Sequence, residues 1–230
     1  FLGVFDEIRK RMAKENGVGA ALFSFNSKGA CPVCKGRGAI VTELVFMDPV
    51  TTECEACGGK RYSEEALSYK YHGKNIVEIL EMSAEEGEKF FRDCPKIHKV
   101  LHAMVEGGLP YLSLGQPLST FSGGERQRVK LAKYLNQKGN IYVLDEPTTG
   151  LHASDVKTVM ELLDSLVERG NTVIVIEHNM DVVKLADYVI DIGPDGGTLG
   201  GEVVFTGTPQ EMIQNSETIT ARYLRKSIEE

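Results

Sequence analysis

Four cysteines stand in two Cys-x-x-Cys pairs, a spacing that could bind a metal ion. The pairs are Cys31 with Cys34 and Cys54 with Cys57, and nineteen residues separate them. This pattern is typical of a four-cysteine zinc site, in which each turn presents two thiolates to one tetrahedral Zn²⁺. Because four sulfurs leave no open position for water, the metal is expected to hold the fold and not to take part in catalysis.

Glycines follow both cysteine pairs, at Gly36, Gly38, Gly58 and Gly59. They allow the backbone to turn closely behind the sulfurs. A redox-active pair and buried cysteines without metal are the alternative interpretations, but two such turns around one strand-forming hairpin favour zinc. Cys94 stands alone and is predicted to be a packed thiol.

A second group of residues could bind phosphate. Residues 121–127 read FSGGERQ and precede an amphipathic run. Ser122 and Glu125 have the spacing of a capping box, so a helix is expected to begin here with free N–H groups above Gly123 and Gly124. Such a helix N-terminus attracts anions. This signal is weak by itself, because capped helices with glycines are common.

Acidic residues end the next hydrophobic run, residues 140–147, where Asp145 is followed by Glu146. At the end of a strand, one carboxylate can hold Mg²⁺ through its water shell while its neighbour orients or deprotonates an attacking water. A further run, residues 171–178, ends in Glu177 and His178. His178 could donate a hydrogen bond to a terminal phosphate, although a capping or core histidine is the simpler interpretation of that residue alone.

Strands and helices alternate around these residues. Four hydrophobic runs indicate strands, at residues 140–147, 171–178, 187–193 and 201–207. The first two are expected to be buried parallel strands. A helix is expected between them, with Ser154 or Asp155 as its N-cap and Gly170 at its end. The alternation predicts a parallel α/β sheet.

The chain as a whole is predicted to have four parts. They are an N-terminal helix and strand over residues 1–30, a zinc module over 31–60, a helical subdomain over 61–115 and an α/β part over 116–230. The first part is expected to contain a helix over residues 5–13 and a short strand over 21–25. The zinc module contains a strand-like run over 39–47. Ser83 and Glu86 predict a further capping box in the helical part.

Composition limits the class of protein. The 230 residues are 42% apolar and 26% charged, values that are ordinary for a globular protein and exclude disorder and collagen. No apolar run reaches the length of a membrane span, and the first fifteen residues are too charged for a signal peptide. We therefore expect no membrane association and a reducing, cytoplasmic compartment.

The phosphate-binding and acidic segments together resemble the ABC-type ATPases. The matching motifs are the signature FSGGERQ over 121–127, the Walker B strand IYVLDE over 141–146 and the switch histidine His178. The resemblance implies that two ATPase domains enclose ATP, so that the signature of one faces the phosphate loop of the other. It assigns ATP and Mg²⁺ binding to Ser122, Gly123, Gly124, Glu125, Gln127 and Asp145, and catalysis to Glu146 and His178.

A more specific resemblance is to the UvrA family, the damage-recognition ATPases of bacterial nucleotide excision repair. It covers nearly the whole chain and matches the C-terminal ATPase half. Besides the cysteine module before an ABC signature, the matching segments are LGVFDEIRKR over 2–11, FSFNSKGAC over 23–31, GKNI over 73–76, DEPTTGLH over 145–152 and the string over 170–197. This resemblance implies double-stranded DNA, a second copy bound through the ATPase domains, and a UvrB-like repair protein as partners.

DNA contacts would require a local basic region, because the net charge of the chain is −7. Residues 1–38 contain seven Lys or Arg and three Asp or Glu, a local net charge of +4. The candidate DNA contacts are Arg9, Lys10, Arg11, Lys28, Lys35 and Arg37. The alternative is an ordinary solvated surface.

Other functions are also compatible with parts of the sequence. Arg126 replaces a residue that is usually small in the UvrA family, and residues 35–38 are unusually basic. Both departures are compatible with a UvrA-like paralogue associated with resistance to DNA-binding drugs. A transporter ATPase subunit would have no zinc module. A zinc-binding chaperone of the DnaJ type would carry four Cys-x-x-Cys-x-Gly-x-Gly repeats and would not explain Asp145 and Glu146.

The phosphate loop of an ATPase, Gly-x-x-x-x-Gly-Lys-Ser/Thr, does not occur in the sequence. Gly59-Lys60 and Gly73-Lys74 lack both the earlier glycine and the following hydroxyl residue. In the UvrA family this loop lies upstream of the segment matched here. We therefore expect the chain to be a fragment of a larger protein and to hydrolyse no ATP by itself.

Overall fold

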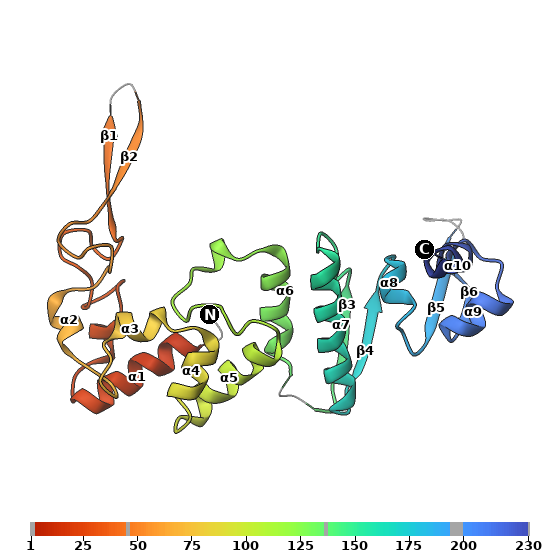
Figure 1. Cartoon of the computed structure of the whole chain (residues 1–230), viewed down its shortest axis with the longest axis horizontal. Coiled ribbons are helices and arrows are strands. Elements are labelled where there is room, and N and C mark those ends of the chain that lie inside the picture. The colour runs from red at the N-terminus through yellow and green to blue at the C-terminus, as the bar shows by residue number, and fades with distance from the viewer. Residues whose placement is uncertain (1–2, 45–46, 136–137, 194–199, 230) are drawn as a thin grey trace. The chain divides into compact units, whose positions relative to one another are not determined.

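The computed structural model of the chain describes residues 3–44, 47–135, 138–193 and 200–229, and Figure 1 shows its elements. The chain forms two compact units, Phe1–Asn136 and Gln137–Glu230. Among the helices in the described ranges, none has the length and apolar character that crossing a membrane requires.

Helix α1 (Val4–Asn16) opens the first unit and contains the predicted helix over 5–13. The predicted strand over 21–25 is wrong, because the chain forms a 3₁₀ helix, η1 (Ala20–Phe23). Leu22 and Phe23 are both buried, although neighbouring residues of a half-buried strand would point to opposite faces. The apolar run therefore turns into the core.

The predicted zinc module contains two antiparallel strands, β1 (Ala39–Leu44) and β2 (Met47–Glu53) (Figure 1). Ala39 pairs with Glu53 at the base, and the register shifts between Thr42 and Leu44. Residues 45–46 of the predicted run lie outside the described residues. The strands extend directly from the two cysteine turns, because the N–H of Cys54 donates to the carbonyl of Gly38 over 3.0 Å.

The predicted helical part contains α2 (Glu64–Ser68), α3 (Ile76–Glu81), α4 (Ala84–Phe90) and α5 (Pro95–Glu106). The capping box of Ser83 and Glu86 is confirmed at the start of α4. These helices and α1 enclose the core of the first unit, whose largest fully buried side chains include Phe23, Phe91 and Leu101.

The 3₁₀ helix η2 (Leu118–Thr120) and helix α6 (Gly123–Ala132) complete the first unit. Val129 of α6 belongs to the same hydrophobic core as α1 and α5. The compact unit therefore includes a helix that follows the predicted border at residue 116, and the functional division into four parts stays a prediction.

In the second unit, β3 (Ile141–Asp145) and β4 (Thr172–Ile176) pair in parallel, as predicted, with Asp145 opposite Ile176. Helix α7 (Ala153–Glu168) connects them. Its N-cap is His152, and not Ser154 or Asp155 as predicted, because the His152 ring accepts the N–H of Ser154. The predicted stop is confirmed, since Gly170 has a φ of 84°.

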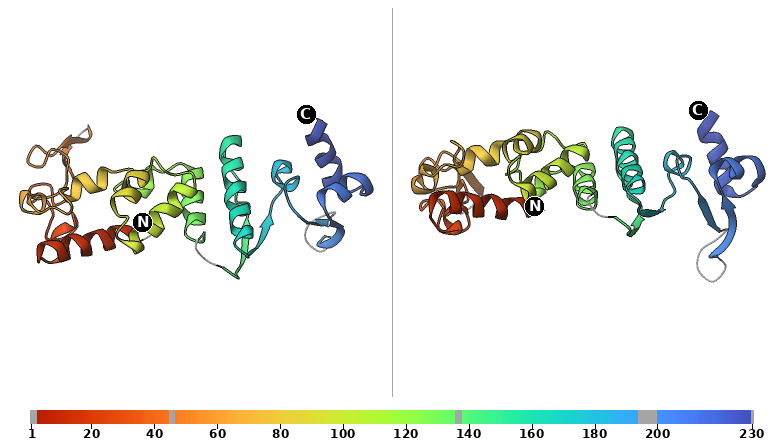
Figure 2. Two further views of the ribbon diagram at one scale, coloured as in Figure 1. Left: turned by 60° about the horizontal axis from the view of Figure 1, so that its bottom comes forward. Right: turned by 90° about the horizontal axis from the view of Figure 1, so that it is seen from below.

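Only one face of the β3–β4 pair is covered within the described residues. Helix α7 packs beside this pair (Figure 2), with Val159, Leu163 and Leu166 buried. On the opposite face Ile141 is 70% exposed and Val143 is 63% exposed. The prediction of buried strands is therefore wrong for one of the two faces, because the described elements cover only the other.

The remaining elements are α8 (Met180–Val183), β5 (Val189–Gly193), β6 (Glu202–Gly207), α9 (Pro209–Asn215) and α10 (Ile219–Glu229). Strands β5 and β6 confirm the last two predicted strands, but they pair antiparallel, with Val189 opposite Gly207. The short connection explains this difference, because a parallel crossover needs a dozen or more residues. Met212, Ala221 and Leu224 form a small core beside this pair.

Candidate functional site

The four predicted metal ligands lie together in the first unit. One sulfur from each of Cys31, Cys34, Cys54 and Cys57 lies within 4.8 Å of the other three. The sulfurs of Cys34 and Cys57 are 3.7 Å apart. Four sulfurs bound tetrahedrally to zinc at about 2.3 Å would be about 3.8 Å from one another, so the cluster has the right size for one ion. All four are free thiols.

The turns behind the sulfurs require glycine, as the sequence predicted. Gly36 and Gly38 both have a φ of 79°, and Gly58 and Gly59 have φ values of 51° and 69°. A Cβ on Gly36 would collide with the carbonyl oxygen of Phe25. These glycines therefore allow the tight backbone turns that surround the four sulfurs.

The thiols of this cluster differ in acidity. Burial raises the pKa of Cys34, but hydrogen bonds from the Gly38 N–H and from the neighbouring thiols outweigh it and lower the pKa to about 7. The Gly38 nitrogen lies 3.2 Å from the Cys34 sulfur. Burial raises the pKa of Cys57. Since metals bind thiolates, occupation of the site would release protons.

The start of α6 has the predicted capping box. The hydroxyl of Ser122 accepts the N–H of Glu125 over 3.2 Å, and the Glu125 carboxylate accepts the N–H of Ser122 over 2.7 Å. Sequence analysis missed two further partners. The Tyr111 hydroxyl donates to Glu125 over 2.9 Å, and the buried Arg128 donates to Tyr111 over 3.3 Å. Burial raises the pKa of Glu125, but these hydrogen bonds lower it overall.

The first turn of α6 is open to an approaching anion. A Cβ on Gly123 would meet no other atom within 4 Å, whereas Gly124 is buried in the unit. Gln127 is half-buried and Arg126 is exposed. The first N–H groups of a helix have no partner within the helix, so Gly123 presents the accessible part of a positive helix end.

Replacing Ser122 with alanine should lower the free energy of unfolding of the first unit by about 1 kcal/mol, because the cap is lost. Urea unfolding of the chain, followed by circular dichroism, measures the change. Ser122→Asp retains an acceptor for the Glu125 N–H and should stay near the wild type. Equal stability of the alanine variant and the wild type would show that the cap contributes nothing.

The acidic residues and the predicted switch histidine meet at the ends of β3 and β4. Asp145 is the last residue of β3, and the N–H of Glu146 donates to the carbonyl of Ile176 over 2.9 Å. One carboxylate oxygen of Glu146 lies 3.6 Å from Nδ1 of His178. The other accepts the Thr149 hydroxyl over 2.9 Å. The two predicted catalytic residues are thus held beside each other.

Glu177 is a functional candidate that the sequence analysis did not select. Its carboxylate accepts hydrogen bonds from Thr148, His178 and Asn179. Burial raises its pKa, but the hydrogen bonds from Thr148 are the main cause of a lower value overall. The sequence feature that could have identified Glu177 is its position directly before His178.

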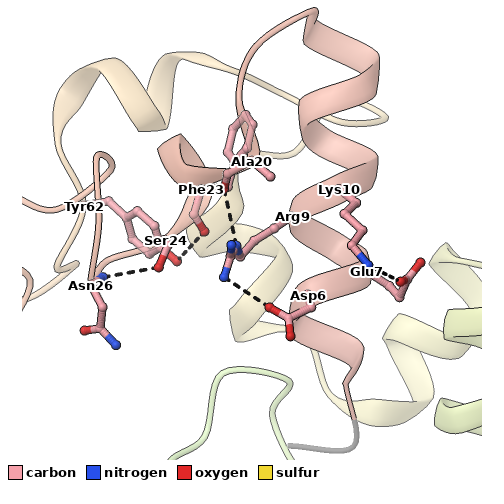
Figure 3. A network of polar contacts seen from close by, with 9 residues as sticks. All are labelled: Asp6, Glu7, Arg9, Lys10, Ala20, Phe23, Ser24, Asn26 and Tyr62. Atoms are coloured by element: carbon pink, nitrogen blue, oxygen red, sulfur yellow. Dashed lines mark hydrogen bonds and ion pairs between the residues drawn. The ribbon is translucent and has the colours of Figure 1, made fainter.

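The candidate DNA contacts have different surroundings. Figure 3 shows Arg9 paired with Asp6 at 3.1 Å and Lys10 paired with Glu7 at 2.9 Å, all on α1. Arg9 also donates to the carbonyl of Ala20 over 3.3 Å. Arg11 is half-buried, whereas the remaining candidates are exposed, namely Lys28, Lys35 and Arg37. The last two flank Gly36 in the zinc module.

Known proteins match this chain over its whole length. The profile of the ABC transporter family matches residues 42–149. UvrABC system protein A of Staphylococcus aureus (strain COL) is 49% identical over 100% of this chain and 25% of its own length. The protein of the same name from Aquifex aeolicus (strain VF5) is 50% identical over 97% of this chain and 25% of its own length.

A solved structure matches as well. The crystal structure of UvrA2 from Deinococcus radiodurans superimposes with a TM-score of 0.81 at 46% identity, covering 99% of this chain and 28% of that one. The predicted fold class, an ABC-type ATPase fold with a cysteine module, is thereby confirmed. The chain spans about a quarter of the length of the curated relatives it matches.

Proposed function

Because this chain belongs to the UvrA family, we propose that it is part of an ABC-type ATPase that couples ATP binding and hydrolysis to DNA damage recognition in nucleotide excision repair. One observation carries the chemical part of this proposal. Glu146 and His178 lie 3.6 Å apart beside Asp145, at the ends of two parallel strands. A metal ligand, a base and a phosphate ligand are groups that nucleotide hydrolysis needs at one place.

Each residue has a distinct proposed role. Asp145 would hold Mg²⁺ through water, and bound Mg²⁺ would neutralise charge on the phosphates. Glu146 orients and deprotonates the attacking water. His178 donates to the γ-phosphate. The Thr149 hydroxyl donates to one oxygen of the Glu146 carboxylate, and the His178 ring lies 3.6 Å from the other, an arrangement that favours one orientation of the carboxylate.

The signature residues Ser122, Gly123 and Gly124 are proposed to contact ATP held by a second ATPase domain. This role suits the exposed first turn of α6, which combines a capped helix end with a glycine open to solvent. Glu125 and Gln127 complete the segment. Turnover is proposed for a longer protein that supplies the phosphate loop, with a second copy and a UvrB-like protein as partners.

The zinc module is proposed to bind one Zn²⁺. Its exposed Lys and Arg side chains are proposed to contact the phosphates of duplex DNA. Lys35 and Arg37 are exposed next to the first cysteine pair. The same basic turn favours a second candidate, a UvrA-like paralogue of resistance to DNA-binding drugs. A comparison of growth with such drugs and after ultraviolet irradiation, in cells lacking the gene, distinguishes the two functions.

Replacing both Lys35 and Arg37 with alanine should weaken duplex binding by the full-length protein. In a plot of the logarithm of the binding constant against the logarithm of the salt concentration, each lost phosphate contact should reduce the magnitude of the slope by about 0.9. A salt titration of DNA binding measures this slope. A matched control replaces Lys89 and Lys157, two exposed lysines that are paired with acids on their own helices. Equal slopes for the wild type and the Lys35/Arg37 variant would remove these two residues from the DNA surface.

The same titration with damaged duplex separates two roles of the zinc module. If the two side chains only neutralise phosphates, their loss should lower affinity for damaged and undamaged DNA alike, since phosphates carry no sequence or lesion information. A change in preference between the two duplexes would instead indicate that the module senses the shape or deformability of DNA.

A further inference from the structure

Glu177 joins the two loops that carry the proposed catalytic pair. One of its carboxylate oxygens accepts the N–H of Thr148 over 3.0 Å and the Thr148 hydroxyl over 2.5 Å. The other accepts the N–H of His178 over 3.1 Å and that of Asn179 over 3.3 Å. One oxygen therefore serves the loop after β3, and the other serves the loop after β4.

The link is protected from solvent on the side of Thr148, whose side chain is buried. Hydrogen bonds of this charge-assisted kind are shorter and stronger than those between neutral groups. Because Thr148 lies two residues after Glu146 and His178 directly follows Glu177, the carboxylate fixes both members of the pair through adjacent backbone.

Glu146 needs such support. Its φ of 43° lies in the left-handed region, which side chains other than glycine rarely adopt. A conformation of this kind persists only where the surroundings determine it. The Glu146 N–H is held by Ile176, and the next anchor along the chain is the bond between Thr148 and Glu177.

We infer that Glu177 is a positioning residue, which holds Glu146 and His178 at the separation that ATP hydrolysis requires. The inference rests on the proposed function. A local role as the cap of α8 does not account for Glu177, because Asn179 already caps that helix by accepting the N–H of Asp181 over 3.0 Å.

The test compares three variants of the full-length protein. Glu177→Gln puts an amide against backbone donors, and Thr148→Val removes the hydroxyl with little change of shape. Both should lower kcat for ATP on the order of 10- to 100-fold, because misplacing reacting groups by about 1 Å has that effect. KM for ATP should change less than twofold. Thr148→Ser keeps the hydroxyl and should retain the wild-type kcat.

The double variant Glu177→Gln with Thr148→Val adds a second criterion. If the two residues act through one link, its kcat should equal that of the single variants and not the product of both losses. Wild-type kcat in Glu177→Gln and Thr148→Val would overturn the inference. An increase in KM with unchanged kcat would overturn it too, since it would indicate a role in nucleotide binding.

Amide hydrogen exchange in the 230-residue chain supplies a readout that is independent of turnover. Glu177→Gln should speed exchange at Thr148 and Asn179 while amides in the core of α7 keep their wild-type rates. Unchanged exchange at both sites would overturn the link itself. A wild-type protein that binds no ATP and hydrolyses none would refute the proposed function instead, and the exchange data would still decide whether Glu177 joins the loops.

Discussion

Replacing Glu146 with glutamine in the full-length protein should cut ATP hydrolysis by about two to four orders of magnitude and leave ATP bound. Loss of a general base typically has an effect of this size. Glutamine has the shape of glutamate and can still accept the Thr149 hydroxyl, so the loop should keep its conformation. Steady-state kinetics and equilibrium binding of ATP together measure the two effects.

A matched control is Glu168→Gln, which changes the same functional group at the end of α7, away from His178. This variant should hydrolyse ATP at the wild-type rate. Loss of ATP binding in Glu146→Gln would contradict the assigned role, because it would place Glu146 in nucleotide binding and not in water activation. Retained hydrolysis would exclude Glu146 as the base.

Neither the 230-residue chain nor its Glu146→Gln variant should hydrolyse ATP. The phosphate-loop motif, which would bind the α- and β-phosphates, does not occur in this sequence. An extended protein that includes the phosphate loop should regain turnover. Robust hydrolysis by the 230 residues alone would contradict the proposal that the site is assembled from several segments.

The local features of this chain could be predicted because their causes lie within a few residues. The capping boxes of Ser83 and Ser122 require a hydroxyl and a glutamate three residues apart, and both formed as expected. The same holds for the glycines behind the cysteines, whose positive φ follows from the tight turns. At a helix cap or a tight turn, the local backbone geometry favours few residue types, so the residue types predict the geometry.

The missed features depend on contacts between distant residues. Glu177 binds Thr148 across 29 residues, and Tyr111 reaches Glu125 across 14. Neither partner has a sequence pattern that points to the other. The error at η1 has a similar origin, because Leu22 and Phe23 turn into a core that helices far along the chain complete. The exposure of Ile141 and Val143 likewise reflects which elements cover the strands.

Changing Cys31 to serine should unfold residues 31–60 and leave the α/β unit folded. The hydrophobic cluster of this module contains only cysteines and Ile40 within the described residues. Val41 and Val50 of the strands are exposed, so burial contributes little to the stability of the module. Structural zinc binds zinc-finger peptides with an apparent free energy of about 10–16 kcal/mol, and zinc bound to these four cysteines would contribute folding energy in the same way.

Hydrogen exchange by segment, with metal analysis of the pure protein, tests this expectation. The wild type should contain one Zn²⁺ per chain, and Cys31→Ser or Cys57→Ser should lose it and exchange rapidly over residues 31–60. Cys94→Ala is the matched control, because Cys94 is buried in the helical core beside Tyr71 and lies outside the cysteine cluster. It should keep a full equivalent of zinc. Well under one equivalent in wild-type protein purified without chelators would contradict the zinc site, and the four thiols would then need another explanation.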